Sequence, residues 1–284
     1  MKILLIGANG QLGSDLRRIL RPHDVVPTTH QTLDVTQLDD VRRCVTANEP
    51  EVIINTSAFH RVDAIEEDLM SAFEVNALGV RNLAVSAKAA GAVLVHFSTD
   101  YVFDGNATRP YTESDSPNPI NGYGVSKLAG EKLAGYLWEK SFVIRTCGLY
   151  GHAGSSGKGG NFVETMLQKA MKGEPLRVVN DQRLTPTSTR ELARKVAQLI
   201  ETRNYGLYHI TANGDCSWYE FAREIFARAG IRADLSPTTS DEYRTPAKRP
   251  RYSVLENARL KQLGMDDLKE WSVALGEYLD SREK

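Results

Sequence analysis

Short apolar runs alternate with stretches of helical periodicity through the first half of the chain. The runs are almost wholly apolar, which is typical of parallel strands buried on both faces. They lie at residues 2–6, 52–55, 92–97 and 142–145. Between them, apolar positions recur at helical spacing, and we expect helices over residues 68–90 and 127–140. This alternation predicts an α/β fold, a Rossmann-type doubly wound parallel sheet covered by helices.

The pattern changes after about residue 150. Ser188 with Glu191, and Ser217 with Glu220, have the spacing of capping boxes and predict the starts of two helices. Short strands are expected at residues 176–179, 207–210 and 253–255. We interpret residues 1–150 as a dinucleotide-binding domain. Residues 151–284 are interpreted as a smaller, mostly helical substrate-binding lobe, built from separate segments.

A glycine-rich turn follows the first strand directly. Gly7, Gly10 and Gly13 are spaced Gly-x2-Gly-x2-Gly, and a helical stretch comes next. Such glycines allow a tight turn and let the backbone approach a pyrophosphate at the helix N-terminus. The loop after residues 52–55 is made of small residues, where a cofactor could lie. The residues expected to contact the dinucleotide in these segments are Gly7, Asn9, Gly10, Gln11, Leu12 and Ala58.

The end of the second strand bears on the choice of cofactor. Thr28, Thr29 and His30 offer neither an acid to repel a 2′-phosphate nor an arginine to bind it. We therefore expect NADPH to be used, with tolerance for NADH. Asp34, followed by Val35, either faces the adenosine or only helps to start the next helix, where Thr36 resembles an N-cap.

Tyr123 and Lys127 are four residues apart at the start of a predicted helix. Positions i and i+4 share a helical face, so the phenol and the ammonium can point into one pocket. A nearby positive charge favours the phenolate and lowers the pKa of tyrosine. Ser98 and Thr99 end a central strand, on the rim where ligands of doubly wound sheets bind. Tyrosine and lysine at this spacing are also common by chance, as a half-exposed helical pair.

Composition excludes several classes of partner. The 284 residues carry a net charge of −1, so nothing indicates a nucleic-acid or polybasic membrane surface. No apolar run is long enough to span a membrane. The three cysteines, Cys44, Cys147 and Cys216, are far apart and odd in number, which favours free thiols and a cytoplasmic protein. No cluster of acidic or histidine residues predicts a metal site.

These motifs together resemble those of extended short-chain dehydrogenases/reductases. The run Ser-Thr-Asp-Tyr-Val-Phe-Asp-Gly at residues 98–105 resembles, more specifically, the dTDP-4-dehydrorhamnose reductase family. Later segments agree in the same order, among them Gly-Asn-Phe-Val at residues 160–163 and Ala-Lys-Arg-Pro at residues 247–250. The likeness covers nearly the whole chain.

The resemblance implies NADPH-dependent reduction of the C4 ketone of dTDP-4-dehydro-L-rhamnose, giving dTDP-L-rhamnose. It implies that Tyr123 donates the proton and that Lys127 holds the nicotinamide ribose and lowers the tyrosine pKa. Thr99, with Ser98, would hydrogen-bond the ketone oxygen. Asp100 could order water beside the site or be only a turn residue. A homodimer is a further expectation.

The sugar nucleotide needs groups that bind its diphosphate. We expect Asn161 at a helix start, together with Arg183 and Arg249, to supply them, with Phe103 near the sugar or base. Gly148 stands where many members of the family have a tryptophan, so the sugar and the base stay open. Two other hypotheses are a non-catalytic dinucleotide-binding regulatory subunit, like the beta subunit of methionine adenosyltransferase, and a related sugar-nucleotide epimerase or dehydratase.

Overall fold

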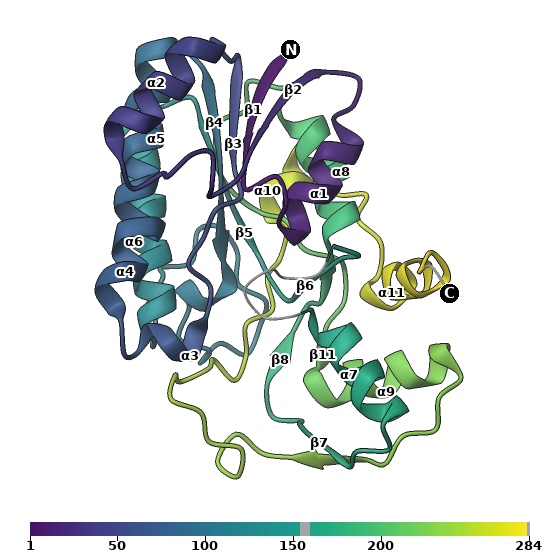
Figure 1. Ribbon diagram of the computed structural model, residues 1–284. Coiled ribbons are helices and arrows are strands. Elements are labelled where there is room, and N and C mark those ends of the chain that lie inside the picture. The colour runs from purple at the N-terminus through teal and green to yellow at the C-terminus, as the bar shows by residue number, and fades with distance from the viewer. Residues whose placement is uncertain (154–159, 283–284) are drawn as a thin grey trace.

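The computed structural model describes residues 1–153 and 160–282. Its larger lobe is built on a parallel six-stranded sheet in the order β10-β5-β4-β3-β1-β2 (Figure 1). The strands are β1 (Lys2–Ile6), β2 (Asp24–Thr28), β3 (Val52–Asn55), β4 (Val93–Thr99), β5 (Ser141–Thr146) and β10 (Gly206–His209). The predicted Rossmann-type sheet is confirmed.

Helices cover both faces of this sheet (Figure 1). One face packs on α1 (Gln11–Ile19), α8 (Thr189–Leu199) and α10 (Ala258–Gln262), which contribute Leu16, Val196 and Leu260 to the core. The other face packs on α2 (Leu38–Asn48) and α5 (Gly79–Ala90), with α6 (Gly122–Leu137) beside them. The strands are therefore buried on both sides, which explains why their sequences are continuous apolar runs.

The first lobe takes in more of the chain than residues 1–150. Strand β10 pairs with the free edge of β5, and Tyr208 at its centre is fully buried. Helices α8 and α10 share one hydrophobic core with β1 and α1. The prediction that residues 151–284 form only the second lobe is corrected here, because the apolar residues of these segments are buried against the large sheet.

The smaller lobe is mostly helical. Its core holds Phe221, Ile225 and Leu275 from α9 and α11. Its helices are α7 (Phe162–Met171), α9 (Trp218–Ala229) and α11 (Trp271–Asp280). Its strand pairs are β7 (Leu176–Val179) with β12 (Leu235–Thr238), and β8 (Arg183–Leu184) with β11 (Cys216–Ser217). The pair β6 (Leu149–Tyr150) and β9 (Thr187–Ser188) lies where the chain passes between the lobes (Figure 1).

Some elements differ from their predictions. Helix α6 begins at Gly122, not near residue 127, because the Asn121 side chain accepts the Gly124 N–H at 2.8 Å and caps it. The stretch at residues 68–90 divides into α4 (Leu69–Phe73), a π-helical segment η1 (Glu74–Leu78) and α5. The strand expected at residues 253–255 is only a bridge between Tyr111 and Leu255. The remaining short helices are α3 (Val62–Ile65) and η2 (Asp100–Val102).

Candidate active site

A cavity of about 950 Å³ opens at the carboxyl ends of the large sheet and is lined by residues of both lobes. This edge is where doubly wound sheets bind their ligands. Every residue expected to hold the cofactor lines it: Gly7, Asn9, Gly10, Gln11, Leu12, Asp34, Val35, Ala58, Tyr123 and Lys127.

The glycine-rich turn has no room for a side chain at Gly7 or Gly13. Gly7 has a φ of +76°, and a Cβ there would lie 2.6 Å from the Thr56 hydroxyl oxygen. A Cβ on Gly13 would collide with the Gly7 carbonyl. Gly10 is the N-cap of α1 without a capping side chain, so the helix presents backbone N–H groups at the cavity. This cradle fits the pyrophosphate of a dinucleotide.

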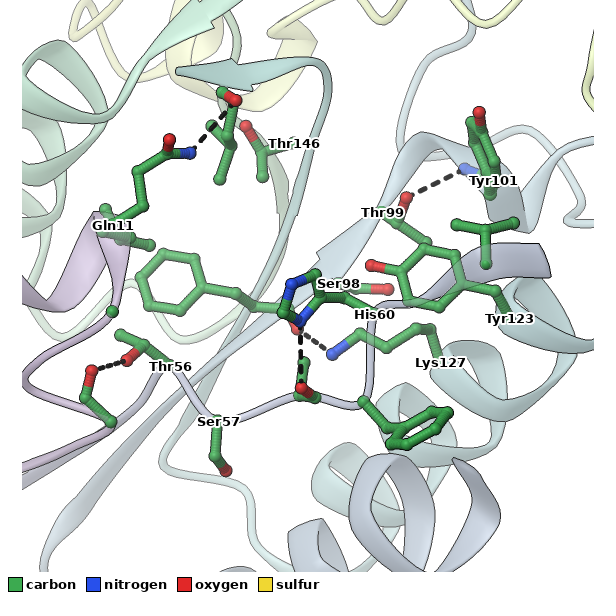
Figure 2. Close-up of a pocket in the computed structure, with 18 of the residues that line it drawn as sticks. Gln11, Thr56, Ser57, His60, Ser98, Thr99, Tyr101, Tyr123, Lys127 and Thr146 are labelled. Atoms are coloured by element: carbon green, nitrogen blue, oxygen red, sulfur yellow. Dashed lines mark hydrogen bonds between the residues drawn. The ribbon is translucent and has the colours of Figure 1, made fainter. Parts of the chain in front are cut away.

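Three buried polar atoms on the cavity wall have no hydrogen-bond partner within the described part of the chain. They are Gln11 Oε1, Ser98 Oγ and Thr146 Oγ1. Figure 2 shows Gln11 and Thr146 on one side of the cavity and Ser98 nearer Tyr123. Buried polar groups are nearly always paired, so these atoms suit a ligand that carries hydrogen-bonding groups. A dinucleotide and a sugar both meet this requirement.

Asp34 serves the turn and lines the cavity as well. Its carboxylate accepts the Thr36 backbone N–H at 2.9 Å and the Thr36 hydroxyl at 2.8 Å, and these bonds lower its pKa. The next helix, α2, begins at Leu38 with Gln37 as N-cap, so the expectation that Thr36 is the N-cap is wrong. Asn82 on α5 donates to the carbonyls of Val35 and Thr36 and holds this segment against the cavity.

Thr99, Tyr123 and Lys127 face the same part of the cavity (Figure 2). Lys127 is buried, donates to the Phe97 carbonyl at 2.5 Å, and has its pKa lowered to about 8 by burial. Burial raises the pKa of Tyr123, an ionised Asp100 would raise it further, and a hydrogen bond with Thr99 opposes this rise. The phenol is therefore a weaker acid than a free tyrosine here, contrary to the lowered pKa expected from Lys127, whose ammonium is engaged by a carbonyl.

The second lobe contributes Asn161 and Arg183 to the cavity. Asn161 is the N-cap of α7, since its side chain accepts the Glu164 N–H at 3.0 Å while its amide donates to the Gly151 carbonyl. Arg183 is held by Asp215 at 2.6 Å and by Glu220 at 3.3 Å.

Two residues expected at the substrate do not line the cavity. Phe103 is fully buried in the core, stacked on Tyr111 with ring centroids 4.0 Å apart, so its predicted contact with sugar or base is wrong. Arg249 pairs with Asp63 at 2.8 Å and lies beside Tyr101, behind the cavity wall. Tyr111 sets the position of Phe103, and Asp63 sets that of Arg249. Neither pairing can be inferred from the neighbouring sequence.

Gly148 lines the cavity in a left-handed conformation, with a φ of +55°. A Cβ there would lie 2.9 Å from Leu184 Cδ1, so part of the space expected beside this glycine is filled. Aromatic surface comes instead from Phe162 and Trp218, which line the cavity with ring centroids 4.6 Å apart. These two rings were missed by sequence reasoning, as was Thr146, although its place at the end of β5 matches that of Thr99 on β4.

Neither a metal cluster nor a membrane helix is found among residues 1–153 and 160–282. No three His, Cys, Asp or Glu side chains there gather closely enough to hold a metal ion. No helix of that part is both long and apolar enough to cross a bilayer.

Comparison with known proteins assigns the chain to a family. The model of the RmlD substrate binding domain matches residues 1–283. The chain belongs to the RmlD family. A curated relative, the spore coat polysaccharide biosynthesis protein SpsK of Bacillus subtilis, is 39% identical over 99% of this chain and 98% of its own.

Solved structures of RmlD-family proteins match the fold closely. A dTDP-4-dehydrorhamnose reductase from Clostridium acetobutylicum is 45% identical, with a TM-score of 0.94 over 99% of each chain. A dTDP-4-dehydrorhamnose reductase from Bacillus anthracis in complex with NADP is 37% identical, with a TM-score of 0.95 over 99% of each chain. The likeness therefore covers both lobes of this RmlD-family chain.

Proposed function

We propose that this protein is an NADPH-dependent reductase of a nucleotide-linked 4-keto-6-deoxy sugar. The expected substrate is dTDP-4-dehydro-L-rhamnose, and the product is dTDP-L-rhamnose. The observation that carries the proposal is the convergence of Thr99, Tyr123 and Lys127 on one cavity with the glycine-rich turn, in a chain of the RmlD family. NADH is expected as a second, accepted cofactor, because His30 on the cavity wall is neither an acid nor an arginine.

The cofactor side is formed by the first lobe. The turn at Gly7 and Gly10 and the N-terminus of α1 would hold the pyrophosphate. The segment at Asp34 and Val35, with Ala58 opposite, would hold the adenosine half. Lys127, with a pKa of about 8, keeps most of its charge at neutral pH and would hold the nicotinamide ribose. When bound, NADPH supplies the hydride that reduces the ketone carbon.

The proton comes from the protein. Tyr123 lies beside Thr99, and its raised pKa keeps the phenol protonated at neutral pH. A protonated phenol is the form that a proton donor needs, and it transfers its proton as negative charge develops on the ketone oxygen. Ser98 and Thr99 are placed to hydrogen-bond the same oxygen.

The substrate side is formed by both lobes. Arg183 and the N-terminus of α7, behind Asn161, would meet the diphosphate. Arg249 and Phe103 do not line the cavity, so neither is expected to contact the substrate directly. We also propose that the enzyme is cytoplasmic, in keeping with a nucleotide-linked substrate and with Cys44, Cys147 and Cys216 as free thiols.

The test is oxidation of NADPH by the purified protein with dTDP-4-dehydro-L-rhamnose, followed by mass measurement of the product. The expected product is heavier than the substrate by two hydrogens, and Tyr123→Phe serves as the inactive control. A regulatory subunit would bind NADPH without consuming it. An epimerase would convert the sugar without net oxidation of NADPH. Either result would refute the proposal.

A further inference from the structure

A buried polar cluster lies directly behind Thr99. The Thr99 hydroxyl oxygen is 3.0 Å from Asp100 Oδ1, and Cys147 Sγ donates to Asp100 Oδ2 at 3.0 Å. Ser253 Oγ lies 3.9 Å from the same sulfur. All four side chains line the cavity, and Asp100 is only 4% exposed. The mechanism proposed above uses neither Asp100 nor Cys147.

The number of protons in this cluster decides whether the Thr99 hydroxyl can donate a hydrogen bond into the cavity. The Thr99 hydroxyl has one proton, and its oxygen already accepts the Tyr101 backbone N–H at 3.2 Å. An ionised Asp100 only accepts hydrogen bonds, so Thr99 must give its proton to Asp100 and turns only a lone pair to the cavity. A neutral Asp100 donates to Thr99 instead, while Cys147 donates to the other carboxyl oxygen. The Thr99 proton is then free to face the cavity, on the side where Tyr123 forms its hydrogen bond with Thr99.

The surroundings of Asp100 oppose its ionisation. Burial raises the pKa of this carboxyl, and hydrogen bonds from Cys147, Ser253 and Thr99 only partly offset the rise. Among residues 1–153 and 160–282, the titratable groups that face it are Cys147 after β5, Tyr123 on α6 and Tyr101 on η2, and none of these is a cation. The Arg249 guanidinium lies beside Tyr101 instead.

We propose that Asp100 is a positioning residue whose neutral form, braced by the Cys147 thiol, turns the Thr99 proton toward the ketone oxygen of the sugar nucleotide. The inference rests on the proposed reductase activity and adds a further residue to it. Turnover requires the proton on Asp100. The rate must therefore fall as the pH rises through the pKa of Asp100, where the direction of the Thr99 hydrogen bond reverses.

The test compares pH profiles of kcat and KM, with saturating NADPH, for wild type and three variants. In Asp100→Asn the amide N–H donates to Thr99 as the neutral acid does. Its kcat should stay within about tenfold of wild type, well short of the ~100-fold loss typical of a missing acid–base group. The alkaline fall that belongs to Asp100 should disappear from its profile.

The two Cys147 variants should move this alkaline fall in opposite directions. A serine hydroxyl is a stronger donor than a thiol and stabilises the carboxylate, so Cys147→Ser should shift the fall to lower pH. Cys147→Ala removes the donor and should shift it to higher pH. KM should change little in either variant. Cys44→Ser and Cys44→Ala, on α2 and away from the cavity, are the matched controls and should leave the profile unchanged.

Three results would overturn the proposal. The first is a hundredfold or greater loss of kcat in an Asp100→Asn protein that still binds NADPH. The second is a shift in the same direction, or no shift, in the two Cys147 variants, which also decides the matter if Asp100→Asn does not fold. The third is a wild type that lacks, at the pH of assay, the infrared carbonyl band of a neutral carboxylic acid that Asp100→Asn would remove. This measurement does not depend on turnover. A wild type that shows this band but reduces no keto sugar would refute the proposed function and leave the arrangement of Asp100 supported.

Discussion

At the scale of single residues, the mechanism makes its clearest prediction for Tyr123, the proposed proton donor. Its ring meets Tyr101 edge-on, with centroids 5.9 Å apart, so Tyr123→Phe keeps the packing and removes only the proton donor. We expect kcat to fall by about 10²–10⁴-fold, the usual contribution of a general acid, while NADPH still binds. Single-turnover kinetics and a cofactor titration by fluorescence measure the two effects separately. Turnover close to that of the wild type would contradict the mechanism.

Arg183 and Arg249 form a matched pair of arginines, one on the cavity wall and one behind it. Removing a charge-assisted contact costs about 1.5–3 kcal/mol, so Arg183→Ala should raise KM for the sugar nucleotide by roughly 10–150-fold. NADPH affinity should be unchanged, because the cofactor residues lie on the other lobe. Arg249→Ala loses the ion pair with Asp63 and should mainly lower the melting temperature. A larger rise in KM for Arg249→Ala than for Arg183→Ala would reverse this assignment.

Sequence reasoning succeeded for site residues whose position follows from local spacing. The glycines of the turn and the pair Tyr123 and Lys127 lie on elements that their own neighbours specify. It failed where a distant partner sets the direction of a side chain. Phe103 looked available beside the strand-end motif, but Tyr111 and Arg145 enclose its ring in the core.

At the scale of elements, buried strands were the most predictable and helix limits the least. Strands β1 and β3 match their expected ranges because each is an apolar run with clear ends. Strand β7 also matches, although the exposed Arg177 interrupts its apolar residues. The start of α6 was missed because Asn121 follows a loop rich in Pro and Asn, and its sequence context does not indicate that its side chain caps the helix. The π-helical turn η1 was missed because a single five-residue segment is too short to be recognised from hydrophobic periodicity.

The π-helical turn η1 supports a loop of the cofactor site through one side chain. It carries Asn76, whose buried amide accepts the Phe59 N–H and donates to the Phe59 carbonyl, each at 2.9 Å, and also donates to Ser126. Asn76→Ala leaves these backbone groups unpaired and should cost about 1–3 kcal/mol of unfolding free energy. It should also weaken NADPH binding, because the loop at Ala58 loses its support.

The comparison for Asn76→Ala is Lys88→Ala, an exposed substitution in α5. Urea denaturation and NADPH titration of both variants provide the measurement. Loss of stability with unchanged cofactor affinity would mean that the loop keeps its shape without Asn76.

At the scale of the whole molecule, the packing of segments far apart in sequence was the hardest feature to predict. A strand of four residues, β10, joins the sheet edge after a long excursion through the second lobe, and α8 packs on α1 although about 170 residues separate them. Such pairings depend on which apolar surfaces remain uncovered once the rest has folded, and sequence spacing does not encode that. The family resemblance gave the two-lobe plan, while the assignment of each segment to a lobe required the three-dimensional structure.

One face of the molecule carries several exposed apolar side chains. Large apolar side chains are exposed on α4, η1 and α6, which pack against one another: Leu69, Met70, Leu78 and Val125. Met70 is 71% exposed and Leu78 is 50% exposed, and apolar patches of this kind often mark interfaces. We therefore expect a homodimer formed through this face. Size-exclusion chromatography with light scattering should give twice the chain mass.

Charged substitutions on this face should separate the two copies. Met70→Glu combined with Leu78→Glu places carboxylates where the apolar contact would form, so we expect a monomer that still binds NADPH. Met171→Glu is the matched control, since Met171 is 67% exposed on α7 in the other lobe and should leave the dimer intact. A wild type that runs as a monomer at micromolar concentration, or a control that dissociates as readily as the double variant, would show that this face is not the interface.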